Sequence, residues 1–224
     1  MANKRTYGDS CGIARGLDVI GDRWALLVAR ELLLGPKRFT DLRDGLPGIG
    51  PDVLSARLRD LEQAGVLGRA ALPPPAGSRV YELTEWGREL EPVLLALGRW
   101  GSRTVVRPDH GELSPDALVI ALKTMFDPEA ARDLDAGLEL DLAGHTFALS
   151  VREARLDAVH GSAPAPAARI RTDPGTLAQV LWHGTPLEEA VRAGQFEIAG
   201  DRSLASRFLE LFRAPAPATS GPSR

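Results

Sequence analysis

The chain of 224 residues has one cysteine, few aromatic residues and no long hydrophobic run. Because Cys11 has no second cysteine to pair with, a disulfide-stapled fold is excluded and a reducing, cytoplasmic location is expected. The apolar runs at 32–34 and 93–97 are far shorter than the roughly 18 residues that a membrane-spanning helix needs. The first 12 residues are polar, so we expect neither a secretory leader nor a membrane partner.

The net charge of −3 leaves no strong excess of either sign, but the two halves of the chain differ. Residues 1–108 hold 16 basic and 13 acidic side chains, whereas residues 109–224 hold 11 basic and 17 acidic ones. The content of 44% hydrophobic and 25% charged residues is that of a globular protein. A basic half followed by an acidic half predicts two domains with different partners, and the charge of the first permits nucleic-acid binding.

The boundary between the two domains is expected at 107–111, a polar segment with Pro108 and Gly111 where the charge changes sign. We therefore expect an N-terminal domain over 1–107 and a second domain over 113–213. The remaining segment, 214–224, reads APAPATSGPSR, lacks an apolar period and is expected to be disordered.

The first domain is expected to begin with three helices. Apolar residues at helical spacing over 17–32 predict one helix, which Gly35-Pro36 would stop. Thr40 is expected to cap a short second helix. A third helix is expected to start near Gly50-Pro51, because the first helical position does not need the donor that proline lacks.

A hairpin and a long helix are expected to complete this domain. Strands are predicted over 66–72 and 79–84, on either side of a tip that contains three consecutive prolines. The long helix is predicted over 85–104, where Pro92 indicates either a kink or a late start.

This order of elements is typical of a winged helix-turn-helix, whose third helix enters the major groove of DNA. On the third helix, Leu54, Leu58 and Leu61 share one side, and small or polar residues occupy the opposite side. The side chains predicted to contact DNA lie on that open side, just upstream of it, or at the base of the wing: Lys37, Arg38, Thr40, Ser55, Arg57, Arg59 and Arg79. The alternative is that Arg57 and Arg59 belong to a merely solvated helix face.

Four blocks of this half resemble HxlR-type winged-helix transcriptional regulators: 17–24 (LDVIGDRW), 38–42 (RFTDL), 54–58 (LSARL) and 81–87 (YELTEWG). The resemblance covers roughly residues 8–103 and implies a homodimer that binds double-stranded operator DNA. It also implies dimer contacts from the first helix and from the long helix after the hairpin, here Ile13, Leu17, Val93, Leu97 and Trp100. The chain departs from the family pattern at Gly50, where serine is common, and at the three prolines of the wing tip, near which only Arg79 is charged.

The second half mixes helices and strands, so the whole chain is placed in the α+β class. Helices are expected to begin at Ser114-Pro115, at Asp173-Pro174, at a capping box of Thr185 and Glu188, and at the cap Asp201. Strands are expected over 138–142, 147–151, 155–159, 170–172 and 195–199.

Two blocks, 170–177 and 188–201, resemble the sterol-carrier-protein-2-like (SCP2-like) domain, and the resemblance covers about residues 113–213. It implies a sheet backed by helices around an apolar cavity for a small lipid-like or aromatic ligand. The candidate residues for lining that ligand pocket are Leu118, Leu122, Met125, Phe126, Phe147, Leu149, Leu181, Trp182, Phe208 and Phe212. The alternative, favoured for any one of them, is that these side chains simply fill a core.

Signals for catalysis or metal binding are weak. Residues 8–12 match the nucleophile pattern GxSxG, but no strand can precede them in a polar leader, so we expect no enzyme. The histidines have no ligand spacing and the chain has no phosphate-binding or dinucleotide motif, so we expect no metal and no cofactor. Cys11 stands where family members carry a cysteine that in some senses oxidants; the alternative is a small thiol buried at the dimer interface.

The first functional hypothesis is a dimeric, DNA-binding transcriptional regulator whose second domain binds a small apolar ligand. The alternative is a lipid or apolar-ligand carrier in which the winged helix serves only for dimerisation. The two differ in one measurable property, because DNA binding weakens steeply with salt and a carrier has no such affinity.

Overall fold

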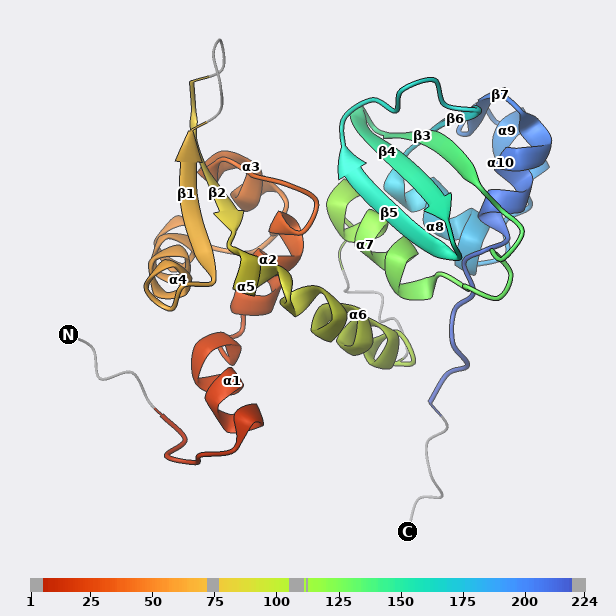
Figure 1. The fold of residues 1–224 in the computed structure, drawn as a ribbon. Helices are drawn as coiled ribbons and strands as arrows, with labels where there is room; N and C mark the ends of the chain where they lie inside the picture. The colour runs from red at the N-terminus through yellow and green to blue at the C-terminus, as the bar shows by residue number, and fades with distance from the viewer. Residues whose placement is uncertain (1–5, 72–76, 105–110, 112, 219–224) are drawn as a thin grey trace. The chain divides into compact units, whose positions relative to one another are not determined.

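A computed structural model describes residues 6–71, 77–104, 111 and 113–218 (Figure 1). The chain divides into two compact units, Met1–Leu94 and Leu95–Arg224. Apart from Gly111, the expected linker at 107–111 lies outside the described residues, as does the wing tip at 72–76. The expected domain limits therefore stay predictions.

The first unit consists of helices followed by a two-stranded antiparallel hairpin. Its elements in chain order are α1 (Gly12–Ile20), α2 (Ala25–Leu32), α3 (Phe39–Asp44), α4 (Pro51–Gln63), β1 (Leu67–Ala71), β2 (Arg79–Leu83), α5 (Glu85–Arg88) and the start of α6 (Leu90–Gly101). A single antiparallel bridge between Lys37 and Tyr81 adds the segment before α3 to the edge of the hairpin. This is the expected winged helix-turn-helix arrangement.

The core of this unit forms because each helix contributes one apolar stripe. Leu54, Leu58 and Leu61 of α4 are almost completely buried, together with Val28 of α2 and Leu42 of α3. Since side chains three and four positions apart share one face of a helix, sealing these leucines leaves the opposite face of α4 outside the core.

The expected single helix over 17–32 is wrong, because the chain forms α1 and α2 with a turn between them. Gly21 ends α1, and its N–H donates to the carbonyl of Leu17. A Cβ at Gly21 would clash with that carbonyl oxygen, so the turn requires glycine. The apolar periodicity was therefore genuine but belongs to two helices.

The structure also shows where the later helices of this unit begin. The expected Thr40 cap is wrong, because α3 is capped at Arg38, whose backbone N–H donates to a carboxylate oxygen of Asp41 at 3.1 Å. The helix expected over 85–104 is two helices, and Pro92 lies in the first turn of α6, which confirms the late start. The start of α4 at Pro51 is confirmed.

The second unit contains a five-stranded sheet in the order β5-β4-β3-β6-β7 (Figure 1). Strands β3 and β6 are parallel, and the other neighbours are antiparallel. Its elements are α7 (Pro115–Met125), β3 (Ala136–Leu142), β4 (His145–Arg152), β5 (Arg155–His160), β6 (Ala168–Thr172), α8 (Pro174–Trp182), α9 (Leu187–Arg192), β7 (Glu197–Gly200) and α10 (Arg202–Leu209). Burial alternates along β3, β4 and β6, so one face of the sheet is sealed and the other carries polar side chains.

Local capping explains where most of these helices begin. The side chains of Ser114, Asp173 and Asp201 accept hydrogen bonds from backbone N–H groups in the first turns of α7, α8 and α10, as expected. Burial raises the pKa of Asp173, but hydrogen bonds from the hydroxyl and N–H of Thr176 act in the opposite direction. The net effect is a pKa below the ordinary value of an aspartate. The expected capping box at Thr185 is wrong, because Pro186 is the cap of α9 and makes no side-chain bond.

The junction between the hairpin and α5 depends on close packing at Gly87. The hydroxyl of Thr84 donates to the carbonyl of Gly65 at 2.7 Å and accepts from the N–H of Gly87 at 3.0 Å. Gly87 is buried, and a Cβ there would clash with the carbonyl oxygen of Val66. The start of β1 and the start of α5 are thereby held in contact.

We expect Gly87→Ala to lower the free energy of unfolding by about 1–3 kcal/mol, because the added methyl group forces the backbone at Val66 apart. Urea denaturation measures the change. Gly68→Ala is the matched control, since no atom lies within 4 Å of its Cβ position. Equal stability of the two variants would contradict the proposed close packing.

Candidate nucleic-acid interface

Helix α4 presents an open face above its buried leucines. Pro51, Asp52 and Val53 in its first turn are exposed, as is Arg59, whereas Ser55 is half-buried. Gly50 caps the helix with an ordinary negative φ and without a side-chain bond, so the backbone there does not require glycine. Exposed N-terminal residues on such a helix are the ones that approach base edges in a major groove.

The two arginines of α4 differ in their surroundings. The guanidinium of Arg57 forms ion pairs with Asp22, in the turn between α1 and α2, and with Asp60 at 3.0 Å. Its side chain is only 15% exposed, and its buried Nε has no hydrogen-bond partner in the part of the chain that the structure describes. Arg59 is exposed, and no ion pair holds it among the described residues. Arg57 therefore fixes the position of α4, and Arg59 is the arginine available to a ligand.

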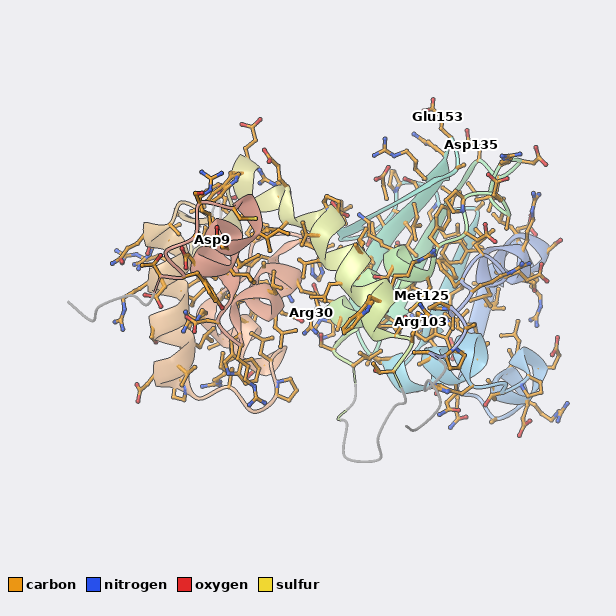
Figure 2. All side chains as sticks on the ribbon, turned by 90° about the horizontal axis from the view of Figure 1, so that it is seen from below. Asp9, Arg30, Arg103, Met125, Asp135 and Glu153 are labelled. Carbon is orange, nitrogen blue, oxygen red and sulfur yellow. The ribbon has the colours of Figure 1, made fainter. Side chains whose placement is uncertain are left out.

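Lys37 is buried rather than presented to solvent. Its Nζ donates to Glu31 at 2.6 Å, and the other carboxylate oxygen of Glu31 accepts from Arg30 at 2.8 Å (Arg30 is labelled in Figure 2). Glu31 is completely buried at the end of α2. A Cβ at Gly45 would clash with the Glu31 carboxylate, so glycine leaves the space that the acid occupies.

The backbone of Lys37 joins this ion pair to the wing. Its N–H donates to the carbonyl of Tyr81 at 3.0 Å, and the N–H of Tyr81 donates to the carbonyl of Lys37 at 2.8 Å. One residue therefore ties α2 to β2 through its side chain and its main chain. Lys37 was predicted from the sequence to contact DNA. In the structure it instead orients the wing against α2.

The other predicted contacts lie at the surface. Arg38 and Thr40 are exposed at the start of α3, and Arg79 is exposed at the outer end of β2, where it pairs with Ala71. The hairpin also carries Arg69, which the sequence reasoning missed.

Arg69 links the hairpin to α4. Its guanidinium donates to Glu62 at 2.9 and 3.2 Å and lies 5.6 Å from the centre of the Tyr81 ring. The hydrogen bond that Arg69 donates to Glu62 and the negative charge of Glu62 raise the pKa of Arg69. In the predicted strand, Arg69 is the polar residue between Gly68 and Ala70. This alternation is the sequence signal from which Arg69 could have been predicted.

The residues expected at a dimer interface are all exposed apolar side chains. Ile13 is 76% exposed and Trp100 is 70% exposed, and Leu17, Val93 and Leu97 are each more than two-fifths exposed. None of the nine residues of α1 is fully buried. Such a short amphipathic helix is marginal by itself, because most helical stability comes from packing an apolar face.

The ligand-pocket candidates of the second unit lie mostly in its core. Eight of the ten are buried, and Leu181 and Trp182 are half-buried. The ring of Phe212 lies 6.3 Å from that of Phe126 and 5.0 Å from that of Phe208. A hollow of about 130 Å³ on this unit is lined by other residues, on β3, β6 and β7. The indole Nε1 of Trp182 is buried, and no described residue offers it a hydrogen-bond acceptor.

Cys11 is exposed at the N-terminal cap of α1, and its N–H donates to the carboxylate of Asp9 at 2.9 Å. The structure describes only two residues before Gly8, and neither belongs to a strand. In the described part of the chain, no three His, Cys, Asp or Glu side chains gather as metal ligands would. None of the described helices has the length and apolar composition to cross a bilayer.

Comparison with known families divides the chain at the same place as its charge. Residues 19–109 match the family described as HxlR-like helix-turn-helix, and residues 107–218 match the family described as alkyl sulfatase C-terminal. The match of the second half is to the alkyl sulfatase C-terminal family, so the SCP2-like assignment expected from the sequence is not confirmed.

Two curated relatives and one solved structure illustrate these matches. The uncharacterized HTH-type transcriptional regulator sll1512 of Synechocystis sp. is 40% identical over 42% of this chain and 70% of its own length. YdeP of Bacillus subtilis, named in the same way, is 36% identical over 49% of this chain and 85% of its own. The inverting sec-alkylsulfatase Pisa1 from Pseudomonas sp. is 23% identical over 48% of this chain, with a TM-score of 0.45. The chain spans 18% of the length of that alkylsulfatase.

We expect Lys37→Met to lower the free energy of unfolding by about 3–5 kcal/mol, because it removes the more buried of the two cations that compensate the Glu31 carboxylate. Chemical denaturation measures this loss, and Arg38→Met, at the exposed neighbour, is the control. The double variant Glu31→Leu with Lys37→Met is expected to recover much of the stability, because the buried acid and its buried cation are removed together, while Arg30, at 22% exposure, keeps access to water. A double variant as unstable as the single one would argue against an ion pair at this position.

Proposed function

This chain belongs to the HxlR-like helix-turn-helix family, with a second half that belongs to the alkyl sulfatase C-terminal family, and we propose from this premise that it binds operator DNA as a homodimer. The observation that carries the proposal is the division of α4 into two faces. Its leucines are sealed in the core, while Arg59 and the first turn are open. Arg38, Thr40 and Arg79 add exposed donors on α3 and the wing for phosphate contact.

The homodimer is proposed from the exposed apolar side chains of α1 and α6. A second copy would remove Ile13, Leu17, Val93, Leu97 and Trp100 from water, at a gain of roughly 25 cal/mol for each Å² of apolar surface. Two recognition helices related by twofold symmetry would enter successive major grooves about one helical turn apart. A roughly palindromic operator follows from that symmetry.

Modulation by a small apolar ligand in the second unit is the further part of this proposal. The buried Nε1 of Trp182 supports it, because a ligand acceptor near α8 would satisfy a donor that has no partner among the described residues. The proposal includes an SCP2-like mode of binding, which is supported only by the resemblance of residues 170–177 and 188–201 to that domain. Such a ligand alters DNA affinity only if it binds the DNA-competent and incompetent conformations unequally.

Oxidant sensing through Cys11 is a second candidate function. The thiol is exposed and lies at the N-terminal end of α1, where an oxidant can reach it. A thiol on a dimerisation helix is placed where its oxidation alters the interface. No catalytic activity is part of the proposal for the first unit, since its two curated relatives are transcriptional regulators.

We expect Arg59→Ala to weaken binding to a selected operator by about 1–3 kcal/mol without changing the oligomeric state. A gel-shift titration at fixed salt measures the affinity, and sedimentation velocity measures the assembly. Arg155→Ala, at an exposed arginine of β5, is the matched control. Unchanged operator affinity in the Arg59 variant would remove this side chain from the interface. Wild-type protein with no salt-dependent affinity for any duplex would favour the carrier function instead.

We expect Trp100→Lys to weaken self-association by at least about tenfold, because it places a charge where an apolar contact is proposed. Analytical ultracentrifugation over a range of protein concentrations measures the dissociation constant. Val159→Lys changes an equally apolar, exposed residue on β5 and is the control. A dimer equally stable in both variants would place the interface elsewhere.

A further inference from the structure

A hollow of about 170 Å³ lies within the first unit, between α1, the start of β1, α5 and the start of α6. Its aliphatic surface comes from four side chains: Val19, Ile20, Val66 and Leu90. Trp86 and Glu89 complete the lining together with Gly16. The volume is that of a small molecule rather than of a peptide segment.

Gly16 keeps one side of this hollow open. Glycine inside a helix is unfavourable, because it loses more conformational freedom than alanine does on folding. No atom lies within 4 Å of the position that its Cβ would take, so packing within the chain does not require glycine there. The missing side chain instead preserves empty space beside α1.

The polar chemistry of the hollow is that of an anion beside an aromatic ring. The carboxylate of Glu89 is exposed and has no ion pair or hydrogen bond from any described side chain. Trp86 is 51% exposed, so its indole is available to a ligand. None of the described residues that line the hollow is basic. A cation over an indole is attracted by the ring quadrupole, and a carboxylate adds a charge-assisted hydrogen bond.

We propose that this hollow is a binding site for a small organic cation, an amine with an apolar or aromatic body. The ammonium group bonds to Glu89, and the body packs on Trp86 and the aliphatic surface. This site lies in the first unit and is separate from the ligand site proposed for the second unit. Binding here does not require that the protein bind DNA, so failure of one proposal leaves the other standing.

The test is calorimetric titration of the full chain with three probes of similar size and different charge. Phenethylamine is the cation, 2-phenylethanol is the neutral analogue and phenylacetate is the anion. We expect the amine to bind at least about tenfold more tightly than the alcohol, and the acid to bind more weakly than both.

Three variants locate the binding. Glu89→Gln is expected to lower the affinity for the amine about tenfold and to leave that for the alcohol unchanged. Glu85→Gln alters an exposed glutamate outside the hollow and is the matched control. Gly16→Leu is expected to abolish binding of both probes by filling the hollow, and Trp86→Ala replaces it as the blocking variant if the leucine variant does not fold.

Several outcomes overturn the proposal. Equal affinities for amine and alcohol, or an unchanged affinity in Glu89→Gln, would remove the recognition of charge. Amine binding that survives the blocking variant would place the site elsewhere. If no probe binds wild-type protein and Gly16→Leu instead weakens self-association, the hollow receives a second copy of the chain.

Discussion

The buried carboxylate of Glu31 is the constraint on which the DNA-binding unit depends. A carboxylate without access to water is tolerated only with compensating donors, here Lys37 and Arg30. Because the backbone of Lys37 also pairs with Tyr81, satisfying the charge fixes the hairpin against α2. Gly45 completes the arrangement by leaving room for the acid at the end of α3. One electrostatic requirement therefore sets the relation between the helix-turn-helix and its wing.

A similar division of roles applies to α4. Its leucines hold it in the core, Arg57 anchors it to Asp22, and Arg69 reaches it from the hairpin through Glu62. Charged side chains that look equivalent in the sequence thus serve different purposes. Basic side chains that have an acidic partner orient the elements. Basic side chains that have none among the described residues remain available to a ligand, and Arg59 is the example on α4.

The sequence predicted those features that depend on neighbouring residues. Pro51 marks the start of α4, and Ser114, Asp173 and Asp201 cap their helices, because the donors they satisfy lie within one turn. The alternation of apolar and polar residues predicted the strands, because this pattern also depends only on neighbouring residues. Most of the winged helix-turn-helix, and the α+β character of the second unit, followed from such local patterns.

The features that the sequence did not reveal depend on distant partners or on steric limits. The break at Gly21 depends on the approach of the Leu17 carbonyl, which periodicity does not reveal. The burial of Lys37 and Arg57 depends on Glu31 and Asp22, and a charge pattern alone does not show which cations are paired. Arg69 was overlooked because its role arises from the pairing of Gly68–Ala70 with the opposite strand and from the nearby end of α4.

The central claim is that the open face of α4 meets duplex DNA. Its most direct test is to select bound fragments from random duplexes and to follow the affinity of the selected site as the salt concentration rises. The account predicts a selected site of roughly twofold symmetry and a log–log salt slope of several released counterions. Failure to enrich any duplex, with an affinity that does not change with salt, would contradict it.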